Sequence, residues 1–475
     1  MKFDNMMNFN LKKEPLHCPH ALGQLNLKSD RFTNCFKCPR GTTFTSENII
    51  KPQEMVNTPE LKQLRKSLMA GEWPKDYNCE SCRSSEEIGY ESTRRKELKF
   101  YQESNNINMD WYLDNVDEDG NIEAINYLEF RFRNSCNLAC RHCSPDYSTQ
   151  WNKVVDGSNY LTSLRDMQGN QDKGPVYESK PHRVSPSQAI PNKEWVKFII
   201  ENIDKIEKNV KLGNDWFQKN SKPLFYTNMP RTDSKLNMFI IETSGGEPFF
   251  QLEFYDLLQE LGKYPEYKKK ISFGITTNGI IATKFKNYDV KKLLSGFGTL
   301  KLTLSLDASE SFYEYFRARG TWKQATSGVI PMVKDIIEEN HVQLSFSVTP
   351  TVFQCFKIED MHKDFTKLIN RPLLRRDVII SHLTYPKYLQ MRWIPQGLKD
   401  KFLKQFDELM TRYSNYSGVA RLIEQPYKEM SYKKIDQKEQ QEQWKIFCKV
   451  TKELDKAHNT NVFDYFPELK EYWVE

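Results

Sequence analysis

The chain has 475 residues, of which 38% are hydrophobic and 13% aromatic, and its mean hydropathy is −0.71. This composition is apolar and aromatic enough to bury a core, which excludes an intrinsically disordered chain. With 69 basic and 63 acidic residues the net charge is only +6, so we do not expect the single-sign field that nucleic-acid-binding proteins concentrate on one face.

The length exceeds the roughly 250 to 300 residues at which one hydrophobic core stops growing, so more than one domain is expected. The start of the chain lacks the apolar run of a signal peptide, and no window offers about 18 uncharged apolar residues. We therefore expect a soluble cytoplasmic protein with no membrane partner. Eight of the ten cysteines precede residue 144, and in a reducing compartment such clusters indicate metal ligands rather than disulfides.

Residues 1–100 predict a loop-rich unit whose cysteines lie among turn-forming residues. A bound metal would supply the stability that so small an apolar core cannot. The cysteines of this unit are Cys18, Cys35, Cys38, Cys79 and Cys82.

The core segment, residues 122–390, begins with an alternation of apolar and polar residues over 127–133, which predicts a strand. Residues 144–236 form an insertion, in which an apolar stripe predicts a helix over 192–210. Beyond it strands and helices alternate, which favours a parallel sheet with helices outside it. The predicted strands are 238–244, 271–277, 300–308, 342–350 and 377–385, and the predicted helices between them include 254–264, 312–318 and 358–369.

Residues 391–475 predict a helical C-terminal extension, because apolar residues recur there at helical spacing. Cys448 lies on one of these stripes and is expected in the core. Cys355 is expected to be structural, with a role in the reaction as the alternative. His382 follows the last predicted strand and is expected in the core or at its rim, with a substrate role as the alternative.

Cys136, Cys140 and Cys143 form the pattern C-x3-C-x2-C directly after the first core strand. Three thiolates at this spacing can converge on one iron–sulfur cluster. A structural zinc ion usually has four ligands, and His142 is an awkward fourth because its neighbour Cys143 already points inward. A zinc site or a structural loop stays open as the alternative.

The stretch CNLACRHC, from Cys136 to Cys143, resembles the cluster loop of the radical S-adenosylmethionine (SAM) enzymes. The resemblance implies a 4Fe-4S cluster whose open iron binds the methionine end of SAM. One electron from the cluster would cleave SAM to a 5′-deoxyadenosyl radical, which would abstract hydrogen from a substrate. It also implies the fold: an α/β core in the form of a partial (β/α)6 barrel.

Three further stretches resemble motifs of that family: SGGEP at 244–248, TTNG at 276–279 and SLDA at 305–308. The resemblance implies that Glu247 accepts the SAM ammonium group, that Arg317 pairs with its carboxylate and that His142 stacks on the adenine. Turn and helix-cap chemistry is the alternative for Asn278 and Asp307. The SAM site implied in this way comprises His142, Gly245, Gly246, Glu247, Pro248, Asn278, Ser305, Asp307 and Arg317.

The N-terminal cysteines resemble the twitch domain, the short form of the SPASM domain, although Asp30 stands in place of a glycine and the unit precedes the barrel. The resemblance implies an auxiliary 4Fe-4S cluster on Cys18, Cys35, Cys79 and Cys82. A zinc ribbon is the alternative, since two C-x2-C pairs form a tetrahedral site. The zinc ribbon requires Cys38, which the auxiliary cluster leaves unused.

Twitch-like domains commonly accompany peptide or protein modification, so by analogy we expect a peptide or protein substrate. A small electron donor of the flavodoxin or ferredoxin type is the expected protein partner. Two alternatives remain open: a radical SAM enzyme acting on a nucleotide or RNA, and a non-catalytic iron–sulfur or zinc scaffold. The GGEP and SLDA stretches argue against the scaffold, which has no use for a SAM site.

Overall fold

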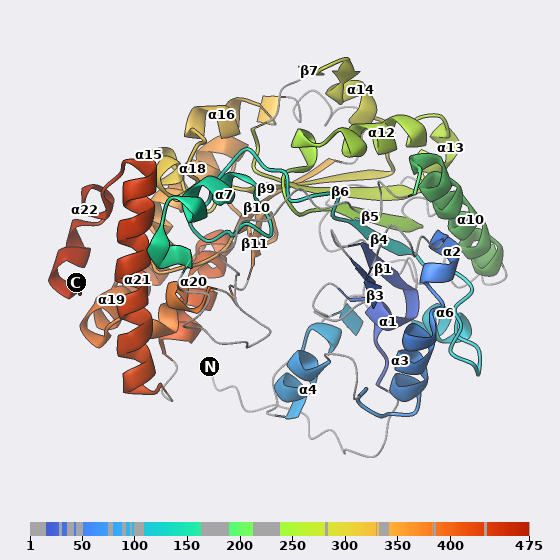
Figure 1. The fold of residues 1–475 in the computed structure, drawn as a ribbon, viewed down its shortest axis with the longest axis horizontal. Helices are drawn as coiled ribbons and strands as arrows, with labels where there is room; N and C mark the ends of the chain where they lie inside the picture. Colours follow the sequence, from blue (N-terminus) through green and yellow to red (C-terminus); the bar gives the residue numbers. More distant parts are fainter. Residues whose placement is uncertain are drawn as a thin grey trace. The chain divides into compact units, whose positions relative to one another are not determined.

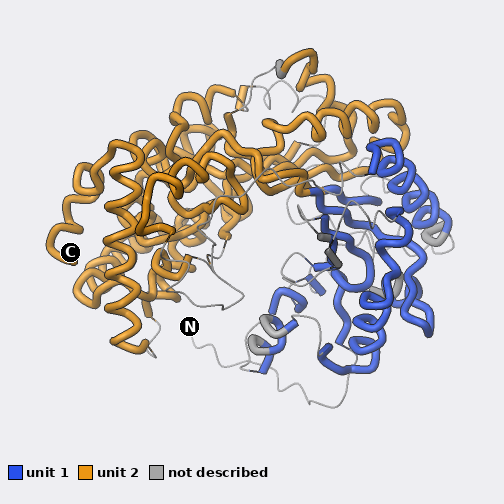
Figure 2. The backbone as a smooth tube through the Cα atoms, viewed as in Figure 1, with its two compact units in different colours: residues 1–130, 186–241 blue, residues 131–185, 242–475 orange. Residues whose placement is uncertain are grey.

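The protein is described by a computed structural model that forms two compact units, residues 1–130 with 186–241 and residues 131–185 with 242–475 (Figure 2). The structure describes residues 16–27, 31–35, 42–43, 51–74, 79–87, 92–95, 97–98, 109–162, 190–211, 238–280, 284–328, 330–331, 342–381, 383, 386–431 and 435–474. Within these ranges no helix is long and apolar enough to cross a membrane.

The second unit is built on parallel strands. Its strand order is β11-β10-β9-β6-β5, and β6, β9, β10 and β11 pair in parallel. The boundary between the units falls inside β5. The strands are β5 (Phe239–Thr243), β6 (Ile271–Thr277), β9 (Thr299–Ser305), β10 (Val342–Val348) and β11 (Val378–Ile380). This confirms the predicted α/β class with a parallel sheet.

Along β5 and β9 buried and partly exposed side chains alternate with period two, as a half-buried strand requires, whereas every residue of β6 except Thr276 is buried. In β9, Leu302 and Leu304 are buried whereas Thr303 between them is partly exposed. Helices cover the apolar face (Figure 1): the ring of Phe254 in α12 (Leu252–Leu261) is tilted against that of Phe273 in β6, with ring centroids 6.3 Å apart. Phe365 of α18 (Ile358–Ile369) stacks on Phe346 of β10 at 4.5 Å.

The predicted helices 254–264 and 312–318 correspond to α12 and α15 (Glu310–Phe316), with ends that differ by two or three residues, and the helix predicted over 358–369 corresponds to α18 with the same bounds. The other elements of this part of the second unit are α7 (Gln150–Asp156), η1 (Pro248–Phe250), α13 (Pro265–Lys268), β7 (Lys284–Phe285), β8 (Tyr288–Asp289), α14 (Val290–Leu294), α15 (Glu310–Phe316), α16 (Trp322–Ser327), η2 (Gln354–Phe356) and η3 (Arg375–Asp377).

The end of the chain is helical, as predicted, and packs on the same unit. Phe466 contacts the rings of Phe312 and Tyr315 in α15 at 5.3 and 5.8 Å, and that of Phe353 at 5.3 Å. The elements are η4 (Lys387–Leu389), η5 (Met391–Trp393), α19 (Gln396–Arg412), α20 (Ser417–Met430), α21 (Gln437–His458), α22 (Val462–Tyr465) and η6 (Pro467–Tyr472).

The first unit has the strand order β5-β4-β1-β2-β3, with β1 parallel to β4 and antiparallel to β2. The predicted helix over 192–210 is present, and its Trp195 lies edge-on to Phe130 of β4 at 5.5 Å. The elements are α1 (Pro19–Gly23), β1 (Gln24–Leu27), β2 (Arg31–Thr33), β3 (Thr42–Thr43), α2 (Pro52–Met55), α3 (Pro59–Met69), α4 (Glu80–Glu87), α6 (Met109–Asp114), β4 (Tyr127–Phe130) and α10 (Asn192–Lys211).

Five strands end earlier than predicted: those expected over 127–133, 238–244, 300–308, 342–350 and 377–385 end at Phe130, Thr243, Ser305, Val348 and Ile380. The strand expected over 127–133 ends at Phe130, because the backbone beyond it turns to the loop that follows β5: the Arg133 and Ser135 carbonyls accept from Gln251 Nε2. The strand expected over 300–308 ends at Ser305, because Asp307 adopts a left-handed conformation with φ of 53°, which no strand continues.

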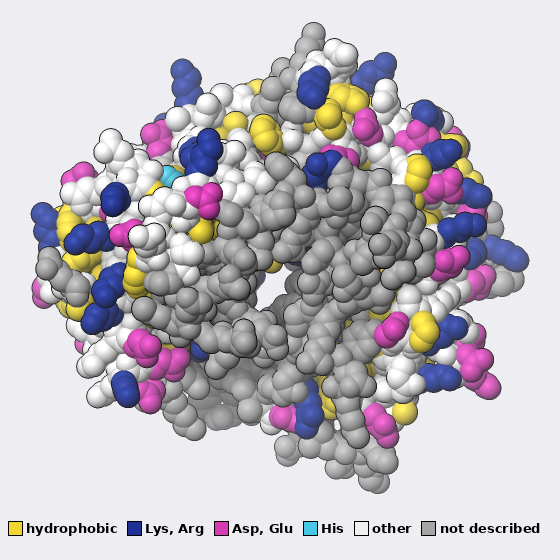
Figure 3. Space-filling view, in the orientation of Figure 1, with side chains coloured by type: hydrophobic (Ala, Val, Ile, Leu, Met, Phe, Trp, Pro, Cys, Tyr) yellow, Lys and Arg dark blue, Asp and Glu magenta, His cyan; other side chains and the backbone are white. Residues whose placement is uncertain are grey.

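The predicted residues Cys38 and His382 lie outside the described residues. On the face drawn in Figure 3, Lys and Arg side chains are interspersed with Asp and Glu, in keeping with the balance of 69 basic and 63 acidic residues. The three-part division of the chain into residues 1–100, 122–390 and 391–475 stays a prediction.

Candidate functional site

The three cysteines of the 136–143 loop come together in the second unit. Cys136 and Cys140 are buried with Leu138 in one cluster, against which Cys143 and Ile280 pack. Burial raises the pKa of the Cys136 thiol to about 12, and the nearby Cys140 adds to this rise. Burial also raises the pKa of Cys143 well above its ordinary value, as do Cys140 and Cys136. Three thiolates so close would need a compensating positive charge.

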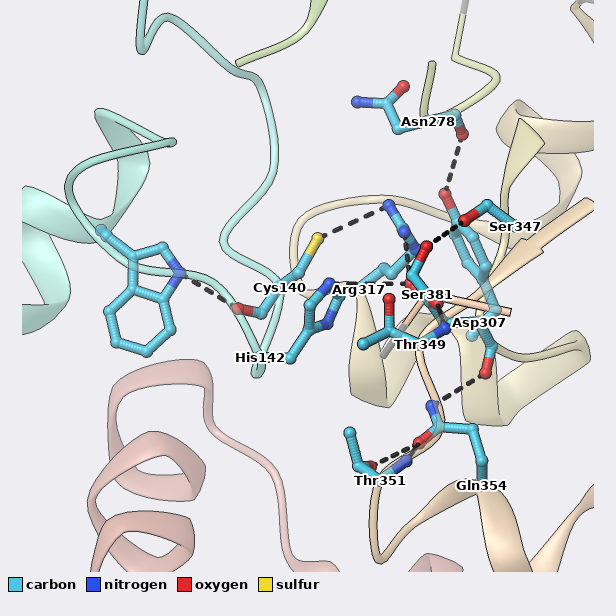
Figure 4. Close-up of polar contacts among 12 residues, drawn as sticks. Cys140, His142, Asn278, Asp307, Arg317, Ser347, Thr349, Thr351, Gln354 and Ser381 are labelled. Atoms are coloured by element: carbon cyan, nitrogen blue, oxygen red, sulfur yellow. Dashed lines mark hydrogen bonds and ion pairs between the residues drawn. The ribbon is translucent and has the colours of Figure 1, made fainter. Parts of the chain in front are cut away.

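The backbone of this cysteine loop is held by the last residue of α15 and by the segment that follows it. Ala139 N donates to the Ala318 carbonyl at 3.0 Å, and Arg141 N donates to the Phe316 carbonyl at 2.9 Å. Trp151 of α7 donates through Nε1 to the Cys140 carbonyl at 3.0 Å (Figure 4). The loop therefore has a defined backbone conformation around Cys140.

The GGEP segment lies against the start of the cysteine loop, and its glycines are required there. Gly245 and Gly246 have φ of 77° and 59°. A Cβ on Gly246 would lie 2.5 Å from both the Arg133 and Ser135 carbonyl oxygens. Glu247 N donates to the Ser135 carbonyl at 2.8 Å. Only glycine allows so close an approach of the two backbones.

Glu247 joins the carboxyl ends of β5 and β6. Its Oε1 accepts from Thr277 Oγ1 at 2.7 Å and from Phe249 N at 3.2 Å, and its Oε2 accepts from Asn278 N at 2.7 Å. Burial raises the pKa of this carboxyl to about 7, against the opposing effect of these hydrogen bonds. Pro248 begins η1, where its fixed φ and missing N–H suit the first position of a helix.

Asn278 extends this network to the cysteine loop. Its Nδ2 donates to Asn137 Oδ1 at 2.8 Å. Its Oδ1 accepts from Ile280 N at 3.0 Å, so the turn chemistry considered for this residue is present as well. Asn137, which the sequence analysis did not single out, thus connects the loop to the end of β6.

Asp307 and Arg317 form a buried ion pair beside Cys140 (Figure 4). Arg317 Nη1 also donates to Cys140 Sγ at 3.7 Å, and Asp307 Oδ1 accepts from Thr349 N at 2.6 Å. Burial opposes the charge of Arg317, but Asp307, Cys140 and Tyr313 together outweigh burial and raise the pKa of the guanidinium. Helix capping, the alternative considered for Asp307, does not hold, because Ser309 is the N-cap of α15; Arg317 is buried.

His142 lies between this ion pair and an aromatic ring. It stacks on Phe316 with ring centroids 5.0 Å apart, and its Nε2 is 3.8 Å from Asp307 Oδ2. Burial lowers the pKa of His142 to about 4, so the ring is neutral at pH 7. Within the described residues, His142 Nδ1 and Arg317 Nε are buried without a hydrogen-bond partner. Such atoms are what a bound polar ligand would satisfy.

Ser305 ends β9 and pairs in register with Ser347, whose hydroxyl lies 3.1 Å from that of Ser381, the residue directly after β11 (Figure 4). Cys355 is buried against the Thr351 carbonyl, with Sγ 3.5 Å from the oxygen, and Cys448 is buried in α21. Both of these thiols therefore occupy the structural positions that were expected of them.

In the first unit, three of the four predicted auxiliary ligands lie together. Cys18 and Cys79 pack against a buried cluster made of Ala21, Leu61, Leu64 and Leu68. Burial raises the pKa of the Cys18 thiol to about 12, and the proximity of Cys79 and Cys82 contributes to the rise. Cys35 follows β2, where its N–H donates to Thr33 Oγ1 at 3.4 Å.

A buried ion pair lies beside these cysteines. Glu86 of α4 pairs with Arg94 at 2.5 Å, both side chains being 8% exposed. Arg94 Nη1 also donates to the His17 carbonyl at 2.8 Å, next to Cys18. This pair connects α4, which begins just after Cys79, to the segment that carries Cys18.

Within the described residues, no group of three or more His, Cys, Asp or Glu side chains is arranged around one metal ion. A cluster sets its cysteine ligands farther apart than one ion does, because each sulfur binds a different iron. The donor set of the 136–143 loop, with three converging thiols, an arginine donating to Cys140 and unpartnered buried polar atoms beside them, fits an iron–sulfur cluster with a polar ligand.

Besides Asn137, three residues that hold this loop were not singled out from the sequence: Arg141, Trp151 and Asp455. Arg141 lies inside the CRHC motif, but its Nη2 donates to Asp455 Oδ1 at 2.6 Å across a separation of 314 residues. No pattern in the sequence points to a partner so distant.

No family model matches the chain, and no curated protein matches it. Among solved structures, it is similar to hexahistidine-tagged anSMEcpe with bound AdoMet, at 18% identity and a TM-score of 0.25. The similarity covers 37% of this chain and 48% of that one, so the chain spans about half the length of the matched protein.

Proposed function

We propose that the chain is a radical SAM enzyme. Cys136, Cys140 and Cys143 would hold a 4Fe-4S cluster, and the residues at the carboxyl ends of β5, β6 and β9 would bind SAM. The observation that carries the proposal is the convergence of three buried thiols with the GGEP segment, which contacts the cysteine loop through Glu247 N and Ser135 O at 2.8 Å.

The cluster and SAM, when bound, would supply one-electron cleavage of SAM to a 5′-deoxyadenosyl radical that takes a hydrogen atom from the substrate. The chain's own residues would hold and shield them. Arg317 donates to Cys140 Sγ at 3.7 Å and so stabilises negative charge on that sulfur. Asp307 fixes the guanidinium in this position.

The SAM site would use the groups that surround the loop. Neutral His142, already stacked on Phe316, offers a flat ring for the adenine. Glu247 would accept the ammonium group together with backbone carbonyls, and Arg317 would receive the carboxylate. The SAM residues proposed with them are Gly245, Gly246, Pro248, Asn278, Ser305 and Asp307.

We propose further that the first unit carries an auxiliary 4Fe-4S cluster on Cys18, Cys35, Cys79 and Cys82. The position of Cys18 beside Cys79 and Cys82 supports this assignment over the zinc ribbon, which makes no use of Cys18. A peptide or protein substrate and a flavodoxin- or ferredoxin-type electron donor follow by analogy with enzymes that carry twitch-like domains.

Anaerobic reconstitution with iron and sulfide tests the proposal. The wild type is expected to bind about eight irons, and the Cys136/Cys140/Cys143→Ala variant about four, since each 4Fe-4S cluster holds four. With SAM and dithionite, only the wild type should form 5′-deoxyadenosine. Cys355→Ala, which removes a buried thiol outside the loop, is the matched control and should retain both properties. A fully loaded wild type that forms no 5′-deoxyadenosine would reject the enzyme in favour of a scaffold.

A further inference from the structure

Arg141, inside the cysteine loop, is a buried cation with an extensive set of partners. Its side chain is 1% exposed. Nε donates to the Tyr315 carbonyl at 2.8 Å, and the guanidinium lies 3.7 Å from the centre of the Tyr315 ring. Nη2 donates to Asp455 Oδ1 at 2.6 Å and to Thr460 Oγ1 at 2.8 Å. Asp455 is the anion that compensates this buried charge.

Asp455 is itself held in place at the end of α21. Its Oδ1 accepts from Thr460 Oγ1 at 2.7 Å, and its Oδ2 accepts from Val462 N at 2.7 Å. Between them the chain turns through Asn459, in the left-handed conformation with φ of 54°. The carboxylate therefore presents a fixed acceptor to Arg141 rather than a mobile surface charge.

The position of Arg141 makes this pair relevant to the cysteines on either side of it. Arg141 follows Cys140 directly, and its own N–H donates to the Phe316 carbonyl at 2.9 Å. A buried guanidinium without its carboxylate is strongly disfavoured, and outward movement of the loop would relieve that cost. Such movement would break the backbone hydrogen bonds of Ala139 and Arg141 together.

We propose that α21 belongs to the cysteine-loop site. Its Asp455 positions Arg141, and Arg141 in turn holds the backbone from which Cys140 would bind a metal cluster. Asp455 and Arg141 are positioning residues. That Cys140 binds a metal cluster rests on the proposed function, whereas the control of the loop conformation by Asp455 is independent of it. The C-terminal helices, which the family resemblance does not cover, thus gain a role in the site.

The first test measures thiol alkylation in the full-length, metal-free protein, with each cysteine followed by mass spectrometry. In Asp455→Asn, the loop cysteines should react faster by about one to two orders of magnitude, because the unpaired Arg141 favours the open loop. Glu453→Gln is the matched control: it lies on the same helix and accepts from Ser158 Oγ instead of from the loop. Equal rates in the two variants would overturn the proposal.

Cys355, buried elsewhere in the unit, reports on general unfolding in the same experiment. If the alkylation rate of Cys355 rises together with the rates of the loop cysteines in Asp455→Asn, the Thr460→Val variant tests the proposal instead. This change removes one hydroxyl that forms hydrogen bonds with both Arg141 and Asp455. Faster alkylation of the loop alone in Thr460→Val supports the proposal, and rates equal to wild type overturn it.

The second test measures the rate at which a chelator removes iron from the reconstituted protein, together with the electron paramagnetic resonance spectrum after reduction. Asp455→Asn should lose its loop iron faster and show an altered spectrum, whereas Glu453→Gln should match the wild type in both. If the wild type binds no iron, the proposed function fails, and the alkylation comparison still decides the role of Asp455.

Discussion

The two groups of cysteines come together by different routes. In the second unit, three thiols lie within eight residues, and contacts from β6, α7, the end of α15, the GGEP segment and α21 hold their loop. In the first unit, Cys18 meets Cys79 and Cys82 across some sixty residues, where an apolar cluster and the Glu86–Arg94 pair are their described supports. Cysteines within a short motif are brought together by the local chain, and neighbouring elements only orient their thiols. Cysteines that lie far apart in the sequence come together only when the unit folds.

The largest expected effect comes from removing one cysteine of the dispersed set. Cys18→Ala should lower bound iron by about four per chain, because a 4Fe-4S cluster seldom survives the loss of one of four cysteines. Cys38→Ala is the matched change and should leave iron unaffected. Iron and zinc are counted after anaerobic reconstitution. Loss of zinc in Cys38→Ala, with no effect in Cys18→Ala, would establish the zinc ribbon instead.

The buried ion pair of the first unit offers the next largest effect. Glu86→Gln should lower the free energy of unfolding of this unit by about 3 to 5 kcal/mol, because it leaves Arg94 charged and buried. The neighbouring Glu87→Gln should cost about 0.5 kcal/mol or less, since its pair with Arg83 is about half exposed. Denaturant unfolding and the alkylation of Cys79 measure both. Equal costs would mean that the pair does not support the cysteines.

A pH effect distinguishes the second unit. Glu247 has a pKa raised from 4.5 to about 7 by burial, so between these values the folded protein binds a proton that the unfolded chain has lost. Its contribution to stability is therefore complete below pH 4.5 and is lost as pH rises through about 7, amounting to about 3 kcal/mol. Glu247→Gln should flatten this part of the stability profile measured by denaturant unfolding, and Glu253→Gln should not. A slope that persists in Glu247→Gln would assign the pH dependence to another group.

The smallest effect concerns the close approach of the GGEP segment to the cysteine loop. Gly246→Ala and Gly296→Ala both place a side chain at positive φ, which costs about 1 to 2 kcal/mol. At Gly296 the nearest atom to the new Cβ would be 3.9 Å away, whereas at Gly246 two carbonyl oxygens would lie at 2.5 Å. Gly246→Ala should therefore cost a further 1 to 3 kcal/mol or so in denaturant unfolding. Equal costs would show that the two backbones separate without penalty.

Local patterns predicted the elements well where periodicity was strong. The strand at 271–277 and the helix at 358–369 have the predicted bounds, because their alternation or apolar stripe extends to both ends. Prediction failed where backbone conformation departs from the pattern of the side chains. The apolar residues of 306–308 continue the alternation of β9, yet the left-handed Asp307 ends the strand.

The residues of the candidate site likewise fall into those that the sequence predicts and those that it does not. The three cysteines and the GGEP segment could be found from sequence, since their spacing is itself the signal. The family resemblance implied SAM-binding roles for Asp307 and Arg317, but their ion pair and its contact with Cys140 could not be predicted, because each residue was equally compatible with an exposed position. Their burial and their contact with Cys140 depend on where α15 ends and on which neighbouring segments cover it.

By itself the sequence determined which residues can ligate a cluster, where strands and helices alternate and which glycines precede Glu247, because these features follow from side-chain chemistry and from periods of two and 3.6 residues. Only the tertiary structure decided that Arg317 donates to Cys140, that Asn278 contacts Asn137 and that Asp455 pairs with Arg141. Each of these contacts joins segments far apart in the chain, and no local pattern encodes a partner that folding alone brings near.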